Sequence, residues 1–67
     1  MFRNSIEHQI WKHRKNANMS QMELSLAMGY KTNVIGLIEN GKRKATVDLL
    51  TKMNNHFGWE FTFKKTV

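Results

Sequence analysis

The stretch SQMELSLAMGYKTNVIGLIENGK, residues 20–42, carries the signals of two short helices joined by a glycine turn. Ser20, followed three residues later by Glu23, is a capping box that begins a helix. Gly29 ends this helix, because glycine readily adopts the left-handed conformation of a C-terminal cap. The pattern predicts a helix over 21–28, about two turns long, which is too short to be stable without packing on neighbours.

The second helix of this stretch is predicted over 32–40. Val34, Ile35 and Ile38 recur at i, i+1 and i+4, which is the spacing of one apolar helix face. The Asn-Gly pair that ends at Gly41 is a strong stop and turn signal. The two helices and their turn therefore form one unit that must bury its apolar faces against the rest of the chain.

Two further helices are predicted outside this unit, over 5–17 and 47–57. Ser5 can cap the first and Thr46 the second, since both hydroxyls can accept from free backbone amides. Apolar residues recur at helical spacing in both segments. In the first they are Ile6, Ile10 and Ala17, and in the second they are Val47, Leu50, Met53 and Phe57.

The segment after Gly58 changes its period from helical to alternating. Trp59, Phe61 and Phe63 alternate with polar residues, which predicts a strand over 59–64. A lone strand cannot satisfy its own backbone groups, so this one needs a partner.

Composition limits the class of protein. The 67 residues allow one small domain, expected over 1–67, whose core needs a supplement to be stable. No cysteine is present to form a disulfide, so oligomerisation is the common remaining supplement. Lys and Arg number 11 against 5 acidic residues, and a net charge of +6 favours polyanions, although a basic protein with no such partner has the same charge.

Neither an enzyme nor a membrane protein is expected. No paired carboxylates converge, and His8, His13 and His56 lack metal-ligand spacing, so no catalytic site, metal or cofactor is predicted. No apolar run approaches the roughly 20 residues of a membrane span. The start of the chain lacks the apolar centre of a signal peptide, and a cytoplasmic protein is expected.

The capped short helix, the glycine turn and the helix ending in Glu-Asn-Gly resemble the Cro/repressor (XRE-type) helix-turn-helix family, over about residues 6–58. The resemblance implies a mainly α-helical, four-helix, lambda-repressor-like domain that binds double-stranded DNA. In that family the second helix of the motif lies in the major groove. The positions that match the family's base-reading residues are Lys31, Thr32, Asn33 and Leu37.

This reading helix departs from the family pattern in two places. Lys31 stands where a serine or threonine cap is usual, so Thr32 or Asn33 can serve as caps instead of reading bases. Leu37 stands at a usually polar position and can contact a thymine methyl, whereas Asn33 can pair bidentately with adenine. Gly36 either lets the backbone approach DNA closely or only relieves crowding.

The resemblance also assigns an ion pair and a set of phosphate contacts. Arg14 and Glu39 match a partly buried pair that orients the reading helix against the first helix. The matching phosphate contacts, about six per protomer, are Ser20, Gln21, Asn40, Lys42, Arg43 and Lys44.

The tail resembles the end of HipB-type antitoxin DNA-binding subunits, in which the C-terminal strands of two protomers pair. Pairing with the N-terminal MFRN of the same chain is the alternative. A two-fold partner is expected to contact Trp59, Glu60, Phe61, Thr62 and Phe63.

The resemblance implies a homodimeric, sequence-specific repressor of a palindromic operator, either autoregulatory or part of a phage switch. The alternative is an antitoxin or inhibitor module whose main role is to bind a protein such as a toxin. Met22 and Leu26 favour that alternative, because they lie opposite the apolar face of their helix.

Overall fold

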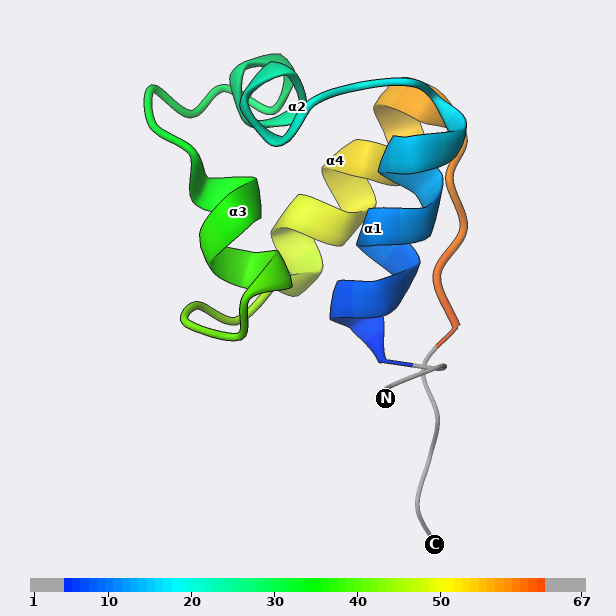
Figure 1. Cartoon of the computed structure of the whole chain (residues 1–67). Coiled ribbons are helices and arrows are strands. Elements are labelled where there is room, and N and C mark those ends of the chain that lie inside the picture. The colour runs from blue at the N-terminus through cyan, green and yellow to red at the C-terminus, as the bar shows by residue number, and fades with distance from the viewer. Residues whose placement is uncertain (1–4, 63–67) are drawn as a thin grey trace, which may run out of the picture.

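The computed structural model describes residues 5–62, which form the four helices of the predicted all-α fold (Figure 1). They are α1 (Ile6–Asn16), α2 (Gln21–Ala27), α3 (Val34–Glu39) and α4 (Val47–Phe57). Figure 1 shows α3 and its two flanking loops on one side of the molecule, while the segment after α4 runs along α1 on the other side. The predicted helical fold class is therefore confirmed.

Three helices begin at the residues that the sequence signals indicated. The Ser5 hydroxyl accepts from His8 N at 3.1 Å, and the Thr46 hydroxyl accepts from Leu49 N at 3.1 Å. Ser20 accepts from Glu23 N at 3.0 Å, and the Glu23 carboxylate accepts in return from Ser20 N at 2.6 Å. Both halves of the capping box are thus formed, and a free amide is satisfied by each half.

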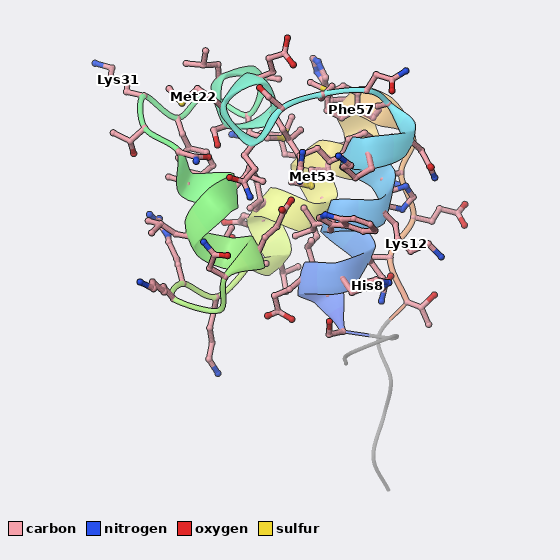
Figure 2. The ribbon with its side chains drawn as sticks, viewed as in Figure 1. His8, Lys12, Met22, Lys31, Met53 and Phe57 are labelled. Carbon is pink, nitrogen blue, oxygen red and sulfur yellow. The ribbon has the colours of Figure 1, made fainter. Side chains whose placement is uncertain are left out.

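The core lies where the four helices meet. In Figure 2, Met53 lies in the middle of the molecule, whereas His8, Lys12 and Lys31 lie at its edge. α3 packs against both α1 and α2, so its position depends on both. The buried apolar side chains are Ile10, Leu24, Met28, Val34, Ile35, Ile38, Leu49, Leu50 and Met53.

Two residues of the predicted apolar faces are exposed: Ala17, which is the C-terminal cap of α1, and Val47. Val47 is 70% exposed, and Leu49 is buried in its place. Val47 is the first residue of α4, and the inward face of the helix begins only at Leu49 and Leu50. At the first turn of a helix the apolar spacing alone does not tell which residue has reached the core.

The predicted strand is also absent from the described part of the tail, residues 59–62. These residues run alongside α1, and side chains of α1 bond to the backbone of Glu60 and Thr62. Gln9 Nε2 donates to Thr62 O at 2.8 Å, and Thr62 N donates to Gln9 Oε1 at 2.7 Å. His13 Nε2 donates to Glu60 O at 2.9 Å. The backbone of this segment thus finds hydrogen-bond partners on a helix of its own chain.

The alternating aromatic residues of the tail share one surface, as the period of two requires. Trp59 stacks on His13 with ring centroids 5.1 Å apart, and Phe61 meets the same imidazole edge-on at 5.2 Å. The remaining residues of the predicted strand, Phe63 and Lys64, lie outside the described range, as does the N-terminal MFRN.

Candidate nucleic-acid interface

A buried serine fixes the start of α3 on α2. Ser25 is fully buried, and its hydroxyl accepts from Ile35 N at 3.0 Å. The same hydroxyl donates to Gln21 O, one turn earlier in α2, at 2.8 Å. Ser25 therefore satisfies a buried amide of the next helix.

α3 begins at Val34, two residues later than the sequence predicted, because Asn33 is its cap. Asn33 Oδ1 accepts from Gly36 N at 3.1 Å. Lys31 and Thr32 lie in the turn before the helix and are exposed. Of the two candidate caps considered above, Asn33 is the one used, and Thr32 is left with its side chain outside the helix.

Gly36 lies beneath two side-chain amides. Asn33 Nδ2 donates to Gln21 Oε1 at 3.2 Å, which joins the beginnings of α2 and α3. A Cβ atom on Gly36 would lie 2.6 Å from Asn33 Nδ2 and 2.8 Å from Gln21 Oε1, closer than real contacts allow. The glycine therefore relieves crowding, and the two amides, not bare backbone, cover this part of α3.

The expected ion pair is present and bidentate. Arg14 Nε donates to Glu39 Oε2 at 2.7 Å and Arg14 Nη2 donates to Glu39 Oε1 at 3.0 Å. The two side chains are only 9% and 6% exposed. Arg14 Nη1 also donates to Met19 O at 2.9 Å, so the guanidinium fixes α1, the loop before α2 and the end of α3 together.

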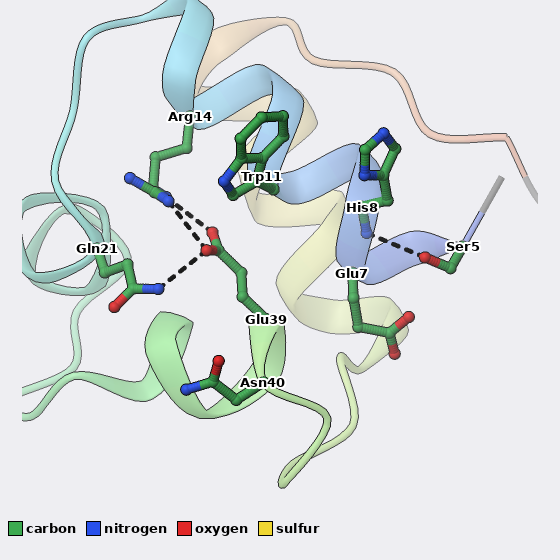
Figure 3. A pocket seen from close by; sticks show the side chains of 8 residues that line it. All are labelled: Ser5, Glu7, His8, Trp11, Arg14, Gln21, Glu39 and Asn40. Atoms are coloured by element: carbon green, nitrogen blue, oxygen red, sulfur yellow. Dashed lines mark hydrogen bonds and ion pairs between the residues drawn. The ribbon is translucent and has the colours of Figure 1, made fainter. Parts of the chain in front are cut away.

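Gln21 connects this ion pair to the cap of α3. Gln21 Nε2 donates to Glu39 Oε1 at 3.0 Å, while its Oε1 accepts from Asn33. Figure 3 shows Gln21 and Arg14 pointing toward the same carboxylate of Glu39. The family resemblance implied that Gln21 contacts a phosphate, and nothing in its spacing indicated that both ends of its amide are held within the protein.

An open groove runs beside this cluster, between α1 and the end of α3 (Figure 3). Trp11 forms part of its wall and stacks on His8 with ring centroids 5.6 Å apart. The lining residues are Ser5, Glu7, His8, Trp11, Arg14, Gln21, Glu39 and Asn40.

The basic residues of the predicted phosphate contacts follow the end of α3. Asn40, Lys42, Arg43 and Lys44 are exposed in the loop between α3 and α4. Arg43 lies over the Tyr30 ring at 5.7 Å from its centroid, so the loop after α3 contacts the turn before it. The turn before α3, α3 itself and the basic loop after it lie on one side of the molecule (Figure 1), and the exposed base-reading candidates Lys31, Thr32 and Leu37 belong to the first two of these segments.

Within residues 5–62, no group of three His, Cys, Asp or Glu side chains is arranged to hold a metal ion. No helix of this part of the chain is long and apolar enough to cross a membrane.

Comparison with known families agrees with this geometry. A family model described as helix-turn-helix matches residues 12–63, which include α2, the turn and α3. No curated protein and no solved structure matches the chain significantly. The matched range covers most of the sequence, and the chain belongs to the Cro/C1-type (XRE) helix-turn-helix family of DNA-binding transcription regulators.

Proposed function

We propose that this protein is a homodimeric, sequence-specific repressor that places α3 in the major groove of a palindromic operator. The observation that carries the proposal is the way α3 is held. Ser25 and the Arg14–Glu39 pair fix its inner side, while Leu37 on α3 and Lys31 and Thr32 in the turn before it remain exposed. A rigid helix with a free outer surface suits base reading.

The charge distribution supports DNA as the partner. Lys42, Arg43 and Lys44 are exposed directly after α3, and the whole chain carries a net charge of +6. Cations at this place can contact the phosphates that flank the groove and fix the register of the reading helix. Ser20, Gln21 and Asn40 remain predicted phosphate contacts, although the Ser20 hydroxyl already caps α2.

The proposed dimer interface is formed by the tail and the beginning of α4. Val47 is strongly exposed beside the half-buried Trp59 and Phe61, and a groove lies between them. Its lining residues are Val47, Leu50, Thr51, Asn54, Trp59, Glu60 and Phe61. A two-fold partner that covers this groove would add apolar burial to a chain whose own core is small.

Binding-site selection on random double-stranded DNA tests the proposed repressor. The expected product is a palindrome with half-sites about 34 Å apart, one helical turn, because two copies of α3 must enter successive major grooves. Selection of a single unsymmetrical site, or of no sequence at all, contradicts the proposal. Repression of a reporter that carries the chain's own promoter region then tests autoregulation against a phage-switch role.

An antitoxin or inhibitor role is the second candidate, favoured by the outer face of α2. Leu26 is 56% exposed and Met22 is 39% exposed on that face. Replacing both Thr32 and Lys42 with alanine separates the two functions. If biological activity survives while DNA binding is lost, protein binding is the main role; if both are lost together, the repressor is supported.

A further inference from the structure

The amide of Asn33 has an unequal set of hydrogen bonds. An asparagine amide offers one oxygen acceptor and an NH₂ group with two hydrogens. In Asn33 the oxygen lies 3.1 Å from Gly36 N and 3.4 Å from Ser25 Oγ. One hydrogen of Nδ2 is donated to Gln21 Oε1 at 3.2 Å. The oxygen is thus turned toward the helix, and the group that remains for a ligand is the second hydrogen of Nδ2.

The amide of Asn33 cannot be reversed without losing these bonds. A reversed amide would place its NH₂ group against Gly36 N–H, which is donor against donor, and would leave the start of α3 uncapped. α3 has only six residues, so its first amides depend on this cap. The oxygen of Asn33 therefore stays inside the protein when the outer surface of α3 meets DNA.

The orientation is further fixed by the neighbours of Asn33. Gln21 Oε1 is itself held, because Gln21 Nε2 donates to Glu39 Oε1 and Glu39 is paired with Arg14. Gly36 leaves the space in which both amides lie. A chain of hydrogen bonds thus runs from the buried ion pair to the amide that faces outward.

A donor alone makes only one hydrogen bond at the major-groove edge of adenine, to N7, and meets the N6 donor beside it. That edge offers N7 as an acceptor and N6 as a donor, so bidentate pairing needs both the oxygen and the nitrogen of an amide. Guanine offers two neighbouring acceptors, N7 and O6. We infer that Asn33 reads DNA as a hydrogen-bond donor only, and that each half-site carries guanine, not adenine, at the position Asn33 contacts.

This inference rests on the proposed function and replaces the adenine pairing that residue type alone had favoured. Its test is site selection with the wild-type protein and with Asn33→Ser. Serine is an equally good cap for Gly36 N but lacks the amide donor. We expect guanine at one symmetric position of the wild-type site, and the serine variant to lose preference there and to bind on the order of tenfold more weakly.

Base analogues test the same contact on the unchanged protein. With 7-deazaguanine, which lacks N7, or 6-thioguanine, whose sulfur is a weaker acceptor than O6, at that position, at least one of the two should weaken wild-type binding, and both analogues still pair with cytosine. These measurements keep the test decisive if the serine variant does not fold, which circular dichroism would reveal.

The possible results distinguish failure of this inference from failure of the proposed repressor function. Adenine at the position that responds to Asn33→Ser overturns the inference and leaves the repressor intact. An unchanged base preference in the serine variant, or unweakened binding to both analogues, also overturns the inference. If the wild-type protein selects no sequence, the proposed function itself is wrong.

Discussion

Arg14 and Glu39 place two opposite charges almost out of reach of water, and the loss of one partner leaves the other uncompensated. We expect Glu39→Ala to lower the free energy of unfolding by about 3 kcal/mol. That is a large part of the stability of so small a domain. Urea denaturation followed by circular dichroism measures this difference.

The double variant Arg14→Met/Glu39→Leu is the matched control. It removes both charges and keeps most of the volume, so it should be more stable than Glu39→Ala alone. A double variant at least as unstable as the single one would show that the pair stabilises by attraction instead of by avoiding a lone buried charge.

Two opposing effects decide the outcome of replacing Gly36 with alanine: alanine has the higher helix propensity, but its Cβ atom would crowd neighbouring side chains. Alanine is favoured over glycine in a helix by about 1 kcal/mol, but its Cβ would displace the amides of Asn33 and Gln21. Both amides are ends of flexible side chains, so we expect Gly36→Ala to change unfolding free energy by less than about 1 kcal/mol. Operator affinity should fall clearly, which a binding titration would show.

A background variant checks the physical reason. In Gln21→Ala/Asn33→Ser the space above residue 36 is vacant, so Gly36→Ala should raise the unfolding free energy by up to about 1 kcal/mol. If alanine destabilises that background as well, crowding by the two amides is not why position 36 is glycine.

The sequence allowed the role of the Arg14–Glu39 pair to be predicted, but not the roles of Asn33 and Gln21. The Arg14–Glu39 pairing was expected from the family resemblance, and its bidentate geometry agrees. The roles of Asn33 and Gln21 were not predictable from spacing. An asparagine before a helix can cap it or face outward, and only the positions of Gly36 and Ser25 decide between the two.

At the scale of the helices, the hydrogen bond from Ile35 N to the Ser25 hydroxyl connects α3 to α2. Ser25→Ala leaves the buried Ile35 amide without its acceptor, which should cost about 1–3 kcal/mol of unfolding free energy. Hydrogen exchange should show faster exchange at Ile35, while the total stability is measured by urea denaturation.

Ser20→Ala is the control for this contact between α2 and α3, since it makes the same chemical change at the N-terminal cap of α2. It removes the cap of α2 and should cost about 1 kcal/mol. Exchange at Ile35 should then rise no more than the loss of global stability requires. If the two variants accelerate hydrogen exchange at Ile35 equally, the Ser25 hydroxyl does not specifically hold α3 to α2.

Helix boundaries were predictable where a side-chain cap stands in the sequence, and this holds for Ser5, Ser20 and Thr46. The tail shows the limit of pattern alone. Alternation at Trp59 and Phe61 predicted a strand, which residues 59–62 do not form; both rings contact His13, but the pattern does not specify what lies beside the segment. In residues 59–62 side chains of α1 supply the hydrogen bonds that a neighbouring strand would have supplied.

For the whole molecule, the basic charge should make operator affinity strongly dependent on salt. Of the predicted phosphate contacts, Lys42, Arg43 and Lys44 carry a charge, so the slope of log affinity against log salt should be about −3 for each protomer. Lys42→Ala should reduce the magnitude of this slope by about 1 per protomer. Fluorescence anisotropy at several salt concentrations measures it, and Lys12→Ala, on the exposed side of α1 (Figure 2), is the control.

Removal of the tail tests the proposed dimer. Truncation after Gly58 deletes Trp59 and Phe61, and with them one wall of the groove beside Val47. We expect monomers in sedimentation and much weaker operator binding, with α1 to α4 retained by circular dichroism. A truncated protein that still sediments as a dimer would place the interface elsewhere.

The cap at Asn33 also limits how this protein can change its target. The same side chain caps α3 and, in the proposed complex, contacts the base, so a mutation at position 33 must first preserve the fold before it can change recognition. Few residue types can cap the start of a helix at this position, chiefly Asn, Asp, Ser, Thr and Gly. A library built to retarget the protein should therefore keep position 33 within that set and randomise Thr32 and Leu37, whose exposed side chains leave the helix start untouched.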